Sequence, residues 1–171
     1  MLRHSLACAM IAERAAKACA LDKDFAYTAG IMHDIGRVVL IVSMPLEYGR
    51  LIEVEADQPR DLLPRERELC GIDHCQAGKT LVREWALPEA FSAITSCHHD
   101  TGALGTPVGS TVGLSCQLAD LLGFGVAAYR SPGCYAGILA AFPEAARSNF
   151  PADARELATQ IANEIAIIES A

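Results

Sequence analysis

One apolar stretch, interrupted by an adjacent imidazole and carboxylate, constrains the fold of this chain more than any other feature. It runs from Ala26 to Leu40 and reads AYTAGIMHDIGRVVL, with His33 and Asp34 side by side. Both side-chain types can bind a divalent metal ion. Neighbouring side chains on a regular helix point about 100° apart, so the two can meet at one ion only where a helix ends or breaks. Gly36 permits such a break, and the stretch therefore predicts a helix boundary at a candidate metal site.

Further histidines and one acid extend this pattern along the chain. The remaining members are His4 in RHS, His74 in GIDHCQAG, His98 and His99 in CHHD, and Asp120 in QLADLLG. Each histidine alone has an ordinary interpretation, as a terminal residue, a satisfied core residue or a polar helix end favoured by the helix dipole. The order H…HD…H…HH…D over the whole sequence is a stronger indication than any single member.

The composition favours helices. The chain has 171 residues, enough for one domain with a real core, and is 51% hydrophobic but only 6% aromatic. A core built from Ala, Leu, Ile and Val favours a helical fold over a β-sandwich. We expect an all-α fold, a compact multi-helix bundle that forms a single domain over residues 1–171. Residues 2–122 form its core part, and residues 123–171 form a C-terminal helical extension.

The charge and the cysteines limit the function classes. The net charge is −7 without a basic run, which argues against general nucleic-acid binding; metal ions could supply the positive charge that an anionic substrate needs.

The seven cysteines are irregularly spaced without CxxC, as suits a reducing cytosol. Cys75 and Cys97 flank His74 and His98, and we favour buried hydrophobes over ligands for both. The apolar run Val38–Val42 is too short to span a bilayer and no signal peptide occurs, so we expect a soluble cytoplasmic protein.

Periodicity and capping residues predict the helices. Asp24 is the expected cap of the second helix, and a helix is preferred to a strand over 37–43 because no second strand candidate exists. Two polar segments, 56–64 and 101–110, are expected to be loops. The expected helices are 2–19, 24–32, 37–43, 46–55, 65–85, 89–97, 111–122, 135–141 and a last one after Asp153 with the stripe Leu157, Ile161, Ile165 and Ile168.

The carboxylates near these motifs receive different interpretations. Asp120 lies among leucines on a predicted helix, and a buried unpaired acid is costly, so a metal ion or a cation is expected beside it. Glu66 and Glu68 are most simply solvated side chains. Asp100 is taken as a local cap rather than a ligand.

The pattern resembles the HD superfamily of metal-dependent phosphohydrolases. The phrases LRHSLACAMIAERAAKAC, FAYTAGIMHDIGRVVL and RERELCGIDHCQAGKTLVREWALPEAF are most similar to the C-terminal half of an HDOD domain, over about residues 2–122. The full ligand set is more similar to the two-metal HD-GYP relatives, although the GYP signature is absent after His99. HDOD domains carry a further helical half before this point. The chain is therefore naturally short or a fragment, and a fragment would expose apolar surface and could form a homodimer.

The resemblance implies roles for individual residues. One ion would be held by His4, His33, Asp34 and Asp120. A second would be held by His74, His98 and His99, with Asp34 bridging and the water between the ions as nucleophile. Asp34 and Arg37 are the implied catalytic residues; Arg37 stands where HD-GYP relatives have a lysine that touches substrate phosphate, and arginine can bind phosphate in a bidentate way. One or two ions of Fe, Mn, Zn, Ni or Co suit this donor set, and relatives also use Mg.

Two functional hypotheses follow from the resemblance. The first is a phosphohydrolase in bacterial signal transduction that cleaves a phosphomonoester or phosphodiester, with a phosphorylated small molecule, a nucleotide or a cyclic dinucleotide as substrate. The alternative is a non-catalytic HDOD module that binds signalling proteins and keeps a vestigial metal site. A helical domain whose histidines are merely core or surface residues is the third and least favoured interpretation.

Overall fold

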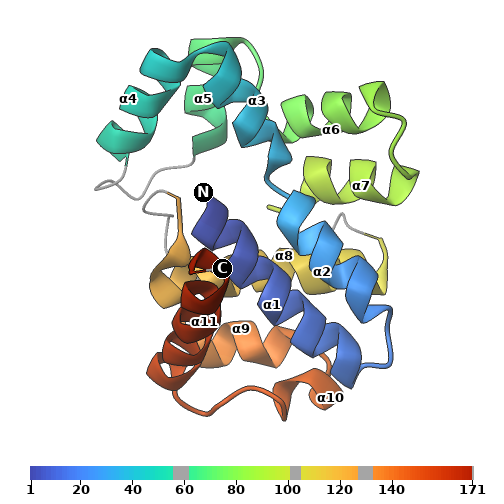
Figure 1. The fold of residues 1–171 in the computed structure, drawn as a ribbon. Helices are drawn as coiled ribbons and strands as arrows, with labels where there is room; N and C mark the ends of the chain where they lie inside the picture. The colour runs from blue at the N-terminus through green and yellow to red at the C-terminus, as the bar shows by residue number, and fades with distance from the viewer. Residues whose placement is uncertain (56–61, 101–104, 127–132, 171) are drawn as a thin grey trace.

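In the computed structural model, which describes residues 1–55, 62–100, 105–126 and 133–170, the chain folds into helices and connecting segments (Figure 1). No strand occurs in these ranges, so the all-α prediction is confirmed. The helices are α1 (Leu2–Ala18), α2 (Lys23–Met32), α3 (Ile35–Ser43), α4 (Pro45–Glu55), α5 (Leu62–Cys70), α6 (His74–Glu84), α7 (Glu89–Cys97), α8 (Pro107–Ala119), the π-helical turn η1 (Asp120–Phe124), α9 (Tyr135–Ala141), α10 (Glu144–Arg147) and α11 (Ala154–Glu169).

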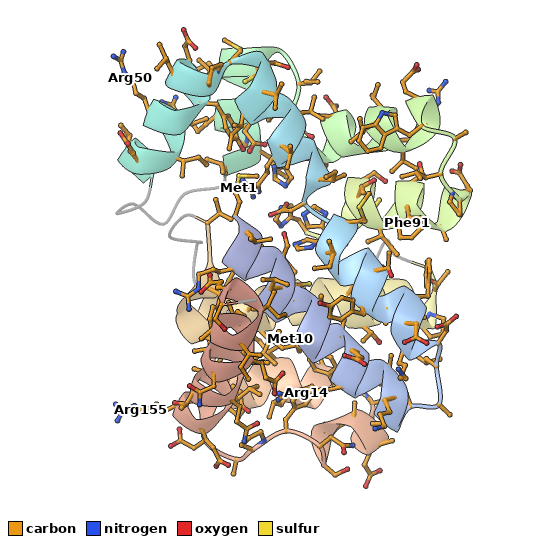
Figure 2. All side chains as sticks on the ribbon, viewed as in Figure 1. Met1, Met10, Arg14, Arg50, Phe91 and Arg155 are labelled. Atoms are coloured by element: carbon orange, nitrogen blue, oxygen red, sulfur yellow. The ribbon has the colours of Figure 1, made fainter. Side chains whose placement is uncertain are left out.

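The alanine-rich helix α1 is the centre of the main core. It packs against α2, α8, α10 and α11, and its small side chains let these helices approach closely (Figure 1). Arg14, which Figure 2 labels together with Met10, donates hydrogen bonds from α1 to Gln160 and Glu164 of α11. Leu157, Ile161 and Ile165 of the predicted C-terminal stripe are fully buried in the same apolar cluster as α1, whereas Ile168 is exposed.

The predicted boundary at His33 and Asp34 is confirmed, but its physical origin differs from the expectation. α2 ends at Met32, Asp34 leaves the helical conformation at φ −102° and ψ 15°, and α3 begins at Ile35. Gly36 lies inside the first turn of α3 and does not make the break. Instead it faces α6, where an added Cβ would lie 1.8 Å from the carbonyl oxygen of His74. Gly36 therefore permits the close approach of α3 to α6.

The prediction of one continuous helix over 65–85 is wrong. Gly71 adopts φ +78°, which favours glycine, and Asp73 caps α6 by accepting a hydrogen bond from the backbone N–H of Gln76 at 2.8 Å. The side chain of Arg67 bonds Asp73 across the turn at 2.6 Å. As a result α5 ends at Cys70, and His74 is the first residue of a new helix rather than a position within one.

Capping residues explain the other shifted boundaries. Asp22, not Asp24, caps α2 by accepting from the backbone N–H of Phe25. Thr106 caps α8 and Pro107 opens it, so this helix begins four residues before the predicted 111. Segment 37–43 is helical as predicted. Of the two predicted loops, residues 56–61 and 101–104 lie outside the described residues.

One apolar stretch, Lys23–Ser43, would be long enough to cross a membrane by length and composition alone; it is the only one in the described residues. It consists of two helices, α2 and α3, separated at His33 and Asp34. Of the most apolar part of this stretch, 44% is buried against the rest of the protein. The stretch packs on α1 and α6 as core helices do.

Replacing Gly36 with alanine is expected to lower the free energy of unfolding by about 1–3 kcal/mol, because the added methyl group would overlap α6. Gly49 in α4 is the matched control: no atom lies within 4 Å of a Cβ there. Gly49→Ala should raise the free energy of unfolding by up to about 1 kcal/mol through helix propensity. Urea unfolding followed by circular dichroism measures both. Wild-type stability of Gly36→Ala would contradict the close helix contact.

Candidate metal centre

The seven predicted ligands lie in one connected cluster, and each stands at or near a helix end. His4 lies in the first turn of α1, His33 and Asp34 between α2 and α3, and His74 at the start of α6. His98 and His99 follow α7, and Asp120 follows α8. Side chains at helix ends are not held to the 100° spacing of a helix interior, so elements far apart in sequence can direct them to one place.

The carboxylate of Asp34 is at the middle of this cluster. Its Oδ1 lies 3.3 Å from Nε2 of His74 and 3.3 Å from Nε2 of His98. Its Oδ2 lies 3.7 Å from Nε2 of His4 and 3.9 Å from Nε2 of His33. Asp34 is only 5% exposed, so four imidazole rings surround a buried carboxylate.

Hydrogen bonds on the far side of three rings set which nitrogen faces Asp34. Nδ1 of His33 donates to the carbonyl of Gly30 at 2.7 Å, and Nδ1 of His98 donates to the carbonyl of Thr95 at 3.2 Å. Nδ1 of His74 bonds Oε2 of Glu66 at 2.6 Å. A carbonyl oxygen can only accept, so the proton of His33 and His98 is on Nδ1 and the lone pair of Nε2 points inward. Metal-binding histidines are oriented in this way.

Burial keeps the rings of His4, His33, His74 and His99 in the neutral form that binds metal. It lowers the pKa of His4 to about 4 and that of His33 to about 3, and it lowers the pKa of His74 and of His99 as well. Burial alone would raise the pKa of Asp34, but the positive charge of Arg37 holds it well below its ordinary value. Neutral imidazoles around an ionised carboxylate are the protonation states that a metal site requires.

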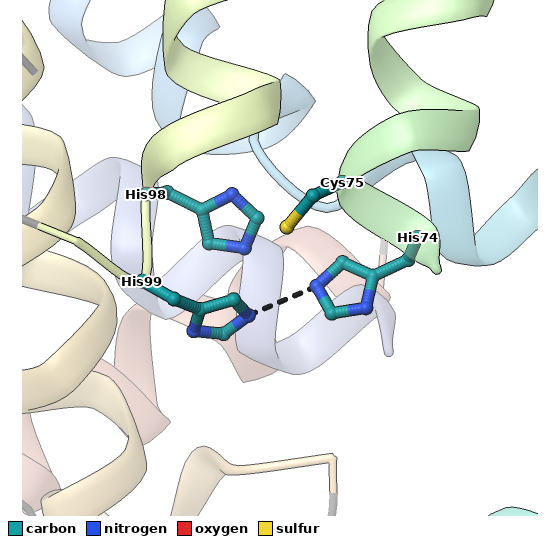
Figure 3. A group of neighbouring side chains, drawn as sticks. All are labelled: His74, Cys75, His98 and His99. Atoms are coloured by element: carbon teal, nitrogen blue, oxygen red, sulfur yellow. Dashed lines mark hydrogen bonds between the residues drawn. The ribbon is translucent and has the colours of Figure 1, made fainter. Parts of the chain in front are cut away.

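Three buried atoms of the cluster lack a hydrogen-bond partner among the described residues: Nδ1 of His4, Oδ1 of Asp34 and Nε2 of His98. Unpaired buried polar atoms cost free energy, and a cation between Oδ1 and Nε2 would satisfy both. Two groups of side chains have possible ligand atoms that all lie within 4.8 Å of one another. One group is His33, Asp34 and His98, and the other is His74, Cys75, His98 and His99 (Figure 3). The chemistry of the donor set therefore fits a divalent transition metal ion.

Asp120 joins the cluster through His4. Its Oδ1 lies 3.3 Å from Nδ1 of His4, and burial raises the pKa of Asp120 to about 7. Cys116 lies on the same side, with its sulfur 3.6 Å from Nε2 of His4. Asp120 thus stands beside the imidazole that the resemblance pairs with it, and its role as a ligand remains a prediction.

Glu66 was missed by the sequence analysis, and its interpretation as a solvated carboxylate is wrong. It is 0% exposed, and its Oε2 accepts from both the backbone N–H and Nδ1 of His74, at 2.8 and 2.6 Å. On a continuous helix the eight-residue separation would span about 12 Å. The break at Gly71–Asp73 brings the two residues together. A sequence signal for that break existed in the glycine and the capping aspartate, Gly71 and Asp73.

Arg37 links Asp34 to Glu66. Its Nε donates to Oδ2 of Asp34 at 2.8 Å, and its Nη1 donates to Oε1 of Glu66 at 3.2 Å. Tyr48, which the sequence analysis also missed, donates from its hydroxyl to the same Oε1 at 2.6 Å. Arg37 is only 4% exposed, so a direct contact with substrate would require the guanidinium to leave both carboxylates. The predicted catalytic role of Arg37 stays a prediction.

A groove of about 550 Å³ reaches the cluster on the side of His99. It runs beside the first turns of α6 and the end of α7, and two cationic side chains, Arg67 and Lys79, lie along it. Its lining residues are Leu63, Arg67, Asp73, Cys75, Gln76, Lys79, Ser96, Cys97, His99 and Asp100.

Comparison with known proteins identifies the fold and the family of this chain. Two solved structures have the same fold: a protein of Shewanella amazonensis called a putative phosphohydrolase (TM-score 0.64, 19% identity) and an HDOD domain protein of unknown function from Geobacter sulfurreducens (TM-score 0.57, 19% identity). The match to the Shewanella protein covers 95% of this chain and 58% of that protein. The match to the Geobacter protein covers 99% of this chain and 60% of that protein. No curated protein matches the sequence significantly. The family model of the HDOD domain matches residues 1–101, more than half of the sequence, and the chain therefore belongs to the HDOD domain family.

Proposed function

We propose that this chain is a metal-dependent phosphohydrolase. The observation that carries the proposal is the buried Oδ1 of Asp34, which lies 3.3 Å from two imidazole nitrogens and has no hydrogen-bond partner. Such an oxygen beside neutral imidazoles is suited to a divalent ion. The fold shared with a protein called a phosphohydrolase is consistent with this activity.

The ligands of the proposed site divide into two groups around Asp34. One group is His74, His98 and His99 with Oδ1 of Asp34, and the other is His4, His33 and Asp120 with Oδ2. Because Oδ2 already accepts a hydrogen bond from Arg37, we propose the first group as the primary ion site. An ion there would supply charge for the non-bridging oxygens of a phosphate and would lower the pKa of water so that hydroxide forms near neutral pH. Fe, Mn, Zn, Ni or Co suits these ligands.

The remaining polar residues support this centre. Arg37 holds Asp34 in place and compensates its buried charge, and Glu66 fixes the ring of His74. Lys79, which is exposed, lines the groove and offers a cation to an anionic substrate, whereas Arg67 in the same groove is paired with Asp73. We propose a nucleotide or cyclic dinucleotide as the substrate class, and action within bacterial signalling in the cytoplasm.

The first test measures the metal content of protein purified without added metal and its turnover of phosphoester substrates. We expect bound transition metal and metal-dependent hydrolysis. Asp34→Ala and His33→Ala should lose more activity than the roughly 10- to 100-fold typical of residues that only support a ligand. Asp24→Ala, which removes an exposed carboxylate on α2, is the control. Metal-free protein, or unchanged turnover in the two site variants, would contradict the proposal.

The second test concerns Glu66. Glu66→Gln keeps the shape of the side chain but removes the charge that holds Nδ1 of His74, so metal affinity should fall by about 10- to 100-fold. Glu68→Gln is the matched control, because Glu68 is an exposed carboxylate in the same helix that pairs with Arg65. Competition against a chromogenic chelator measures both affinities. Equal affinities of the two variants would show that Glu66 does not position His74.

A second candidate function is a non-catalytic signalling module that keeps the metal as a structural element. The observation that favours it is the exposed apolar surface of Val38, Val42 and Leu46, which are 45, 75 and 72% exposed on α3 and α4. Signalling proteins or a second copy of the chain could bind there. Sedimentation and partner-binding measurements on metal-loaded protein that shows no turnover would favour the module, whereas hydrolysis at ordinary enzyme rates would exclude it.

A further inference from the structure

We propose that Cys75 supplies a sulfur ligand to the ion held by His74, His98 and His99, so that three imidazoles and one sulfur hold this ion in addition to Oδ1 of Asp34. The proposal rests on the metal binding proposed above, but not on hydrolysis. The ligand set that the family resemblance implies contains no cysteine. The inference comes from the position of this thiol.

The geometry brings the sulfur to the ring nitrogens. Cys75 follows His74 in the first turn of α6, and its Sγ and one nitrogen of each of the three histidines all lie within 4.8 Å of one another. Figure 3 shows the sulfur directed into the space between the rings of His74 and His98. One of these rings, His98, is fully buried, and its Nε2 has no hydrogen-bond partner.

The surroundings of Cys75 differ from those of an ordinary buried cysteine. Cys8 belongs to the main apolar core, among leucine, isoleucine and alanine side chains. Cys75 is only 7% exposed but belongs to neither apolar cluster of the described residues. It faces imidazole nitrogens instead. Burial beside polar atoms is not explained by hydrophobic packing, whereas a metal ion would use both the thiol and the rings.

The donor set selects the class of metal. Three neutral imidazoles and one thiolate form a four-donor set of the kind that zinc prefers, and sulfur favours Zn, Fe or Co over Mg and Ca. On binding, the S–H bond breaks, the proton goes to solvent and the sulfur lone pair forms the bond to the ion, so no oxidant or reductant is needed. A sulfur ligand from Cys75 therefore favours Zn, Fe or Co among the metals proposed for this site.

Cobalt spectroscopy tests the assignment directly. Protein loaded with Co²⁺ should show a near-ultraviolet sulfur-to-cobalt charge-transfer band. The band should disappear in Cys75→Ser and remain in Cys97→Ser, a matched control because Cys97 lines the same groove. Cys116→Ser is a second control, since Cys116 lies beside His4 and His33 on the other side of the cluster. Elemental analysis of every sample gives the bound cobalt.

The outcomes separate this inference from the proposed function. Loss of the band in Cys75→Ser alone, with cobalt still bound, supports the sulfur ligand. Bound cobalt without the band, or a band that survives Cys75→Ser or disappears in Cys116→Ser, would overturn the assignment and leave the proposed function intact. Protein that binds no cobalt or other divalent metal would overturn both. Zinc affinity provides an independent measure: it should fall at least roughly 10-fold in Cys75→Ser and stay unchanged in Cys97→Ser.

Discussion

The arrangement of the centre depends on the pairing of Arg37 with Asp34. A carboxylate that is 5% exposed is costly to keep ionised unless a partner compensates it, and Arg37 does so through Oδ2. The other oxygen of Asp34 remains directed at His74 and His98. The same guanidinium also meets Glu66, which holds the ring of His74. One buried cation therefore stabilises both carboxylates and, through them, the direction of a predicted ligand.

Close helix packing brings these groups within reach of one another. Asp34 and Arg37 belong to α3 and its cap, whereas His74 begins α6, so the two helices must almost touch. Gly36 provides the contact, because any larger residue would meet the carbonyl oxygen of His74. Gly78 faces Gly36 from α6, and an added Cβ there would lie 3.1 Å from Thr95 of α7. Gly36 and Gly78 thus allow α3, α6 and α7 to pack closely, and this packing sets the positions of the residues in the centre.

Structure that depends on neighbouring residues could be predicted from the sequence. Contacts that depend on the turn at Gly71–Asp73 could not. Helix α1, helix α7 and the boundary at Asp34 follow from periodicity and from the predicted ligands themselves. Glu66 could not be assigned, because a continuous helix over 65–85 would hold it two turns away from His74. Asp73 accepts the capping hydrogen bond that ends this continuity, and a short polar residue after a glycine is a weak signal within an otherwise helical pattern. The pairing of Arg37 with two buried carboxylates likewise requires the tertiary fold.

The choice between hydrolase and signalling module depends on which donors hold the proposed ion. On the side that the groove reaches, His74, Cys75, His98 and His99 together make four donors, the number of a closed structural site. If Oδ1 of Asp34 binds the ion as well, the carboxylate is shared with the proposed second group of ligands, as the proposed hydrolase requires. An ion held by the four donors alone would suit the signalling module instead. The first turn of α6 positions two of the four donors, because it carries both His74 and Cys75. This turn is itself held by Glu66 and by the contact with Gly36.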